Sequence, residues 1–191
     1  MLLATLAVSA VLFFAVDGVH HALGRPAWAL VASVALWGVV ALVSLRAAWR
    51  GGVSFGAGSL TSLAIVTVSA PAVLLAMYLA FVRIDPRLAH LHSDRLGLNC
   101  FALTLAAAAC PLAGLSLARR SSDPLHPMAS GAALGVGCAA LGGVLVALWC
   151  PVATPRHILV GHVLPMGVLA SIGAMLGARV IAMRPGRRLS V

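Results

Sequence analysis

One connecting segment, WCPVATPRHILVGHVLP at residues 149–165, lies between two long apolar runs and carries a cysteine, two histidines, an arginine and three prolines. Thiolate and imidazole are the donors that zinc and copper prefer, which makes Cys150, His157 and His162 candidate ligands. We expect this segment to be a loop. The two histidines are five positions apart, a spacing that does not suit one face of a regular α-helix.

The other cysteines are arranged by depth. If the apolar runs at 98–117 and 131–150 form an antiparallel helical hairpin, positions with nearly the same index sum lie at the same level, as Cys100 and Cys150 do, and also Cys110 and Cys138. Helical rotation turns the two pairs to different faces, so we expect at most one pair in contact. We favour Cys100 with Cys150, near an oxidising compartment where disulfides persist. Cys110 and Cys138 are expected to be small buried hydrophobes.

The composition indicates that lipid is the solvent for most of this chain. Of its 191 residues 62% are hydrophobic and 9% are charged, with a mean hydropathy of +1.07, whereas soluble domains are about a quarter charged. Apolar runs near ~20 residues are long enough to cross a bilayer, and only helices or closed barrels satisfy their backbone there. We predict an all-α, six-helix membrane bundle in a single domain over residues 1–191. Its spans are expected at residues 2–16, 27–45, 60–82, 98–117, 131–150 and 161–183.

The arginines predict the orientation. The chain has thirteen arginines and no lysine, and they flank the apolar runs, a pattern typical of membrane topology rather than of nucleic-acid binding. Six spans put both termini on one side, which would carry eight arginines against five on the other. The positive-inside rule therefore predicts cytoplasmic termini in a multi-pass protein of the bacterial inner membrane. The eight are Arg46, Arg50, Arg119, Arg120, Arg179, Arg184, Arg187 and Arg188.

With this topology six of the seven histidines fall on the outer side. They come from all three outer loops, so they could converge on one site. Three kinds of site remain open: a redox pair of cysteines, a zinc or copper site built on Cys150, His157 and His162, and haem held by paired histidines. The alternative to a site is a set of neutral interfacial imidazoles beside a Cys-Pro helix stop. The outer histidines are His20, His21, His90, His92, His157 and His162.

Small residues mark surfaces where helices approach closely. In the apolar run at 131–150 glycine or alanine recurs at four-residue spacing, and the run at 161–183 has two glycines at the same spacing. We expect packing within one chain rather than dimerisation. The predicted packing positions are Gly131, Gly135, Gly143, Gly173 and Gly177.

Enzyme and transporter signatures are not recognisable. The chain has no glutamate and no aspartate within a predicted span, so carboxylate chemistry and proton relays inside the membrane are not expected. Nucleotide-binding loops, nucleophile elbows and zinc-protease helices are also missing from the sequence. A regulatory or binding role is therefore predicted.

The end of the chain resembles a known family. A Gly-rich helix, WCP, a short loop with His157, and then GHVLPMGVLASIGAMLGARVIAMR are similar to the NrsF-like membrane anti-sigma factors, negative regulators of sigma F. The resemblance implies six spans and a protein that holds an extracytoplasmic-function sigma factor at the inner membrane. It also implies release on oxidative or heavy-metal stress, perceived by cysteines near the outer face. Cys150 is the matching position, and Cys100 is a second candidate.

The chain differs from that family at its beginning. Members carry a hydrophilic cytoplasmic segment before the first span, whereas this chain opens with MLLATLAVSAVLFF, so we expect the true start to lie upstream. Otherwise the sigma factor would be bound by inner arginines. The second hypothesis is a metal- or haem-binding inner-membrane protein without a transcriptional partner. The candidate sigma-facing residues are Arg46, Arg50, Arg119, Arg120, Arg184, Arg187 and Arg188.

Overall fold

Four long helices and one segmented helix make up the part of the chain that the computed structural model describes, which is residues 7, 11, 27–50, 57–86, 97–122, 125–150 and 154–182. The first predicted span, at residues 2–16, lies almost entirely outside these residues. The following predicted residues also lie outside them: His20, His21, His90, His92, Arg184, Arg187 and Arg188.

The helices follow the apolar runs. They are α2 (Ala27–Arg50), α3 (Ala57–Ile84), α4 (Leu98–Ala118) and α5 (Pro127–Trp149). The last helix runs without interruption through α6 (Pro155–Ile158), the π-helical turn η3 (Leu159–Val163), α7 (Leu164–Leu176) and a second π-helical turn, η4 (Gly177–Ile181).

Four of these helices are long and apolar enough to cross a membrane. They are Ala27–Trp49, Leu98–Ala118, Pro127–Trp149 and Pro155–Ile181, while α3 contributes a shorter apolar segment, Leu75–Ile84. Large apolar side chains point outward, as Val31 (67% exposed) and Leu42 (66% exposed) do on α2. Exposed apolar surface on this scale is stable against acyl chains rather than water, so the described part of the chain is an all-α membrane protein.

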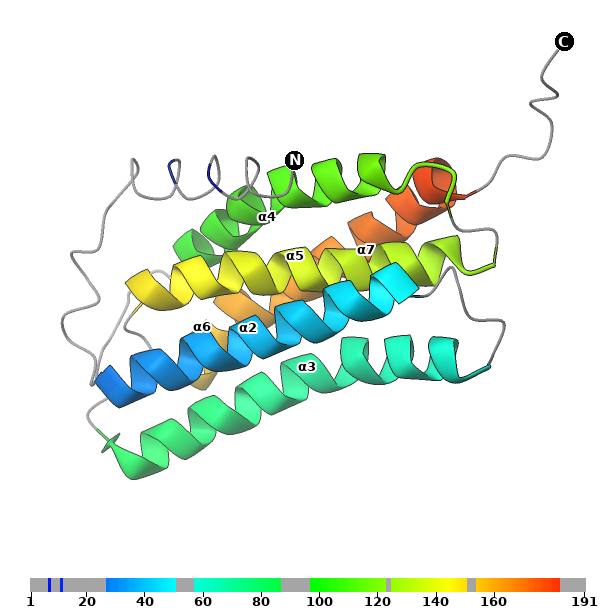
Figure 1. Cartoon of the computed structure of the whole chain (residues 1–191). Coiled ribbons are helices and arrows are strands. Elements are labelled where there is room, and N and C mark those ends of the chain that lie inside the picture. Colours follow the sequence, from blue (N-terminus) through cyan, green and yellow to red (C-terminus); the bar gives the residue numbers. More distant parts are fainter. Residues whose placement is uncertain are drawn as a thin grey trace, which may run out of the picture.

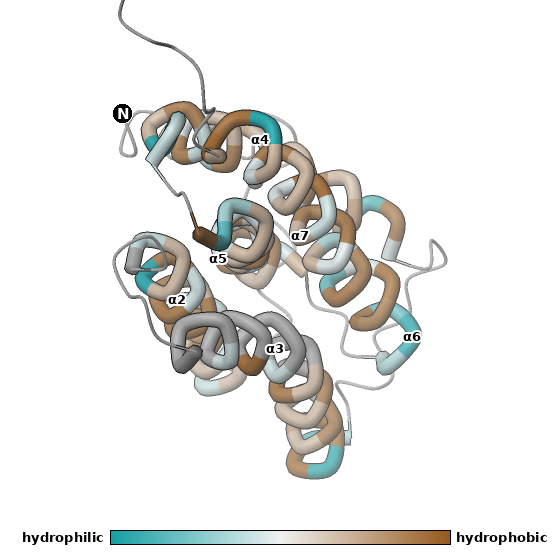
Figure 2. Tube along the Cα trace, turned by 90° about the vertical axis from the view of Figure 1, so that its right-hand side faces the viewer, coloured by the Kyte–Doolittle hydropathy of each residue, from teal (hydrophilic) through white to brown (hydrophobic). Residues whose placement is uncertain are grey.

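Helix α5 lies at the centre of the bundle. Figure 1 shows it between α2 on one side and α4 and α7 on the other, and Figure 2, looking along the bundle, shows these three helices around it. In α5, 72% of the most apolar window is buried, against 33% in the window of α2. Because α5 is rich in glycine and alanine, its side chains fill little space, and its neighbours must come very close to its backbone to bury it.

Glycines on α5 allow that approach. A Cβ at Gly131 or Gly135 would collide with the carbonyl oxygens of Gly173 and Leu169 on the last helix. Gly143 has a different partner, because a Cβ there would collide with the Trp37 ring of α2. The four-residue strip therefore does not serve one partner: over twelve residues the strip rotates about 120° around a helix of 3.6 residues per turn.

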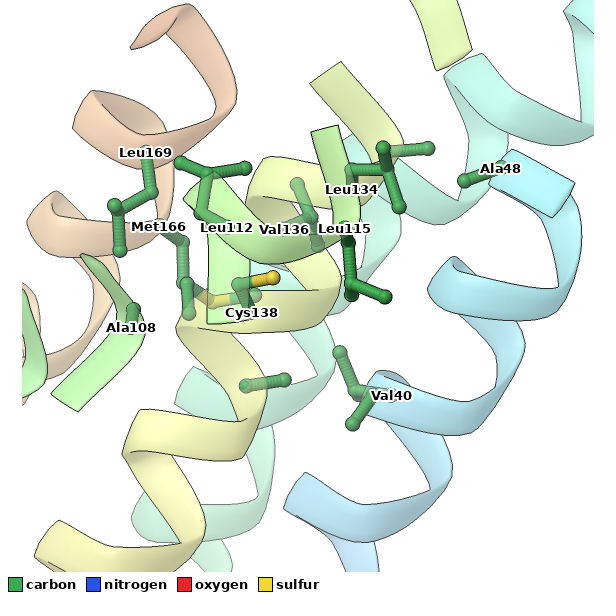
Figure 3. Packing of buried hydrophobic residues seen from close by; sticks show 14 of the residues in the cluster. Val40, Ala48, Ala108, Leu112, Leu115, Leu134, Val136, Cys138, Met166 and Leu169 are labelled. Atoms are coloured by element: carbon green, nitrogen blue, oxygen red, sulfur yellow. The ribbon is translucent and has the colours of Figure 1, made fainter. Parts of the chain in front are cut away.

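Other α5 glycines, which the spacing pattern did not identify, complete the packing. Gly137 faces Leu45 of α2, and Gly142 faces Thr104 of α4. Between these contacts the core is filled by aliphatic side chains and by Cys138, which lies together with Leu112 of α4 and Met166 of α7 (Figure 3).

The π-helical turn η3 has a local cause. Pro165 has no N–H and its ring would clash with the carbonyl of Gly161, four residues earlier, in a regular α-helix. The chain widens instead: the Leu164 N–H bonds the Leu159 carbonyl, five residues back. This turn changes which side chains share a face of the last helix.

Candidate functional site

Four side chains from three parts of the chain meet at one end of the bundle. Cys100 lies in the first turn of α4, Cys150 directly follows α5, His157 lies in α6 and His162 lies in η3. One donor atom from each lies within 4.8 Å of all the others. We call this group the Cys2His2 centre.

The centre is buried and internally bonded. Exposed fractions of its side chains range from 1% for His162 to 5% for His157. The Cys150 sulfur and His157 Nε2 are 3.0 Å apart, at hydrogen-bond distance. The Cys100 and Cys150 sulfur atoms lie within 4.8 Å of each other, and all four cysteines of the chain are free thiols.

Three ring nitrogens in the centre have no hydrogen-bond partner: Nδ1 of His157 and both nitrogens of His162. A buried polar atom left unbonded costs about 1–3 kcal/mol, so native proteins rarely keep one without a reason. Imidazole nitrogens that lie within 4.8 Å of two cysteine sulfurs have the chemistry of metal ligands, and the donor set suits zinc or copper.

Two glycines bring α4 up to the last helix at this point. Gly97, the residue before α4, has a φ of +77°, and a Cβ on it would lie 2.9 Å from the His157 carbonyl oxygen. A Cβ on Gly161 would lie 3.1 Å from the Cβ of Cys100. Neither glycine was identified from the sequence, although G97 and G161 each stand three or fewer positions from a centre residue.

Aromatic residues from two other helices cover the centre. The His162 ring lies 6.1 Å from Trp37 of α2 and 6.2 Å from Tyr78 of α3, measured between ring centroids. Below the thiols lies Val146 of α5, which forms a small apolar cluster with both cysteines. The surroundings are therefore apolar, and the described residues place no carboxylate in the centre.

The structure corrects the expectation of a loop at residues 149–165. From Pro155 onward this segment is the start of the last helix, six residues earlier than the predicted span. The five-residue spacing of His157 and His162 was expected to exclude a shared helix face. The wider π-helical turn η3 brings the two residues onto the same side of the helix, and their ring centroids are 5.6 Å apart.

Of the predicted sensor residues, the cysteines lie in the described part of the chain, whereas two of the histidines do not. Cys100 and Cys150 are in contact at the same level, as the hairpin argument predicts, and Cys100 joins the three ligands proposed from the 149–165 segment. His90 and His92 lie outside the described residues. Cys138 is buried in the core and Cys110 is half-buried.

The opposite end of the bundle carries arginines. Arg46, Arg120 and Arg179 are exposed there, and Arg50 is the last residue of α2. Arg119 was also predicted to face the sigma factor, but the structure buries it. It is 5% exposed, donates a hydrogen bond to the Ala48 carbonyl and lies over the Trp49 ring. It joins α4 to the end of α2 and is not available to a partner.

The structure therefore separates a soft-donor centre at one end from an arginine-rich surface at the other. Neither a curated protein nor a solved structure matches the chain. A family model described as "Negative regulator of sigma F" matches residues 1–182, which is nearly the whole chain. The chain belongs to this family, NrsF.

Proposed function

We propose that the protein is a membrane-bound anti-sigma factor that holds an extracytoplasmic-function sigma factor on the cytoplasmic face of the bacterial inner membrane. Oxidative or heavy-metal stress acts on the Cys2His2 centre at the outer face and releases the sigma factor. The role is regulatory and not catalytic. The observation that carries this proposal, beside family membership, is a buried cluster of thiol and imidazole donors at the end of the bundle opposite Arg46, Arg120 and Arg179.

The orientation belongs to the same proposal. Six spans, including α3 and a span before α2, would put both termini in the cytoplasm together with Arg46, Arg120 and Arg179. The Cys2His2 centre would then lie at the outer end of the helices. This arrangement follows the positive-inside rule.

A path between the two ends is available through three helices. α4, α5 and the last helix each begin or end at the Cys2His2 centre and extend to the arginine end, where the Ser121 N–H bonds the Val180 carbonyl. A change in how the centre holds these helices together would shift their packing at the other end. Two arrangements with different affinity for the sigma factor are sufficient for a switch.

The test is a sigma-dependent reporter in cells that express the cognate sigma factor with this protein. We expect the wild-type chain to repress the reporter and an oxidant or a soft-metal salt to relieve repression. Cys100→Ser and Cys150→Ser should make the output insensitive to stress. Cys110→Ser is the matched control, since it changes a thiol of the same helix as Cys100 outside the centre, and it should respond like wild type.

Full stress induction in both centre variants would remove the thiols from the mechanism. Absence of repression by the wild-type chain would contradict the anti-sigma function itself.

The second candidate function is a metal-binding membrane protein without a transcriptional partner. The Cys2His2 centre favours it as well, because the four donors could serve storage or structure alone. The reporter distinguishes the two candidates: metal binding without any effect on sigma activity supports the second.

A further inference from the structure

We propose that the Cys2His2 centre is a closed, four-ligand Zn²⁺ site formed by Cys100, Cys150, His157 and His162. Its regulatory meaning rests on the proposed function, whereas the metal site itself does not. Zinc is four-coordinate and tetrahedral in structural sites, with two cysteines and two histidines as one of the common ligand sets.

The geometry fits this coordination. Zn–S bonds of ~2.3 Å and Zn–N bonds of ~2.0–2.1 Å place tetrahedral donors roughly 3.3–3.8 Å apart. The four donor atoms lie within 4.8 Å of one another, and the Cys150 sulfur and His157 Nε2 are 3.0 Å apart. Small side-chain movements therefore suffice to close the site around one ion.

The unpartnered nitrogens are the second, independent observation. His162 is 1% exposed, and both of its ring nitrogens lack a hydrogen-bond partner, as does Nδ1 of His157. Coordination would give one nitrogen of His162 a partner, while His157 would coordinate through Nε2, the nitrogen that lies 3.0 Å from the Cys150 sulfur.

Charge selects Zn²⁺ over Cu⁺. Binding exchanges two thiol protons, which leave for the solvent, for one metal ion held by two thiolates and two neutral imidazoles. With Zn²⁺ the charges cancel, whereas Cu⁺ would leave one net negative charge. In a centre walled by Trp37, Tyr78 and Val146 an uncompensated buried charge is costly.

The ion would join three elements that are otherwise linked by short connections. One ligand comes from α4, one follows α5, one lies in α6 and one lies in η3. Four protein ligands leave no open position for substrate, so the site would be structural or regulatory.

The experiment measures metal binding by the purified full-length chain in detergent. Apo protein is titrated with Co²⁺ as a spectroscopic probe and then with Zn²⁺. We expect equimolar binding, the thiolate-to-cobalt charge-transfer band and visible bands of a tetrahedral centre, and complete displacement of Co²⁺ by Zn²⁺. The matched controls, Cys110→Ser and His126→Ala, should behave like wild type.

Substitution of a ligand should weaken Zn²⁺ binding by more than the roughly 10–100-fold that outer-shell changes cause. Cys100→Ser and Cys150→Ser should also reduce the charge-transfer band, while His157→Ala and His162→Ala should change mainly the visible bands. A second measurement needs no variant: Zn²⁺ should protect Cys100 and Cys150 of the wild-type chain from alkylation and leave Cys110 unaffected.

The site is overturned if the wild-type chain does not bind Zn²⁺ stoichiometrically, if it binds only Cu⁺, or if Zn²⁺ fails to protect both cysteines. None of these results depends on a sigma factor. A chain that binds Zn²⁺ in this way but does not repress the reporter would contradict the proposed function and leave the metal site intact.

Discussion

At the scale of single residues, Arg119 shows how a charge is used inside this bundle. Its guanidinium donates to the Ala48 carbonyl, one of the last carbonyls of α2 that have no partner within the helix, and lies 5.7 Å from the centre of the Trp49 ring. The neighbouring Arg120 is exposed. Two adjacent arginines thus have different roles, and only the exposed one can meet a partner or lipid headgroups.

This difference predicts unequal effects on stability. Arg119→Met keeps the aliphatic length but removes a buried charged hydrogen bond, so the free energy of unfolding should fall by about 1.5–3 kcal/mol. Arg120→Met is the matched control and should leave stability nearly unchanged. Thermal melting of the detergent-solubilised protein measures both, and equal melting midpoints for the two variants would contradict the role given to Arg119.

At the scale of elements, the last helix depends on its π-helical turn. The turn follows from Pro165, which cannot complete an α-helical bond with Gly161, and it places His157 and His162 on one face. A regular α-helix would rotate residues five apart by about 140° from each other. Pro165 is therefore not a ligand, but it determines whether His157 and His162 can lie on the same side of the helix.

Replacing that proline should disturb the centre without changing any ligand. Pro165→Ala supplies the missing N–H, which favours regular α-helix and turns His162 away from His157. We expect Zn²⁺ affinity to fall about 10–100-fold, the range of outer-shell effects. Pro111→Ala, which changes the buried proline inside α4, is the control and should retain wild-type affinity. The same Zn²⁺ titration measures both, and unchanged affinity in Pro165→Ala would show that the turn does not depend on the proline.

At the scale of the whole molecule, the sequence predicts the helical spans better than the site. The apolar runs place α2, α4 and α5 within about five residues of their ends, because lipid requires long helices and arginines mark where they stop. The level of Cys100 and Cys150 follows from hairpin geometry in the same way. Spacing alone also identifies Gly131 and Gly135 as close-packing positions.

The rest required the structure, for physical reasons. The helical start at Pro155 was hidden by three prolines in seventeen residues, which are typical of a loop. The shared face of His157 and His162 depends on a π-helical turn that no α-helical periodicity predicts. The burial of Arg119 depends on where α2 ends in space, and Gly97 owes its role to a backbone conformation that is visible only in three dimensions.

In the proposed orientation, the Cys2His2 centre faces outward while the exposed arginines at the other end face the cytoplasm. Arg156 and Arg120 are exposed residues near the two ends, so Arg156→Cys and Arg120→Cys, each made with Cys110→Ser, report on them directly. The measurement is labelling of intact spheroplasts with a membrane-impermeant maleimide. We predict labelling at position 156 in intact spheroplasts and at position 120 only after lysis. The reverse pattern would place the thiols in the cytoplasm and contradict the account.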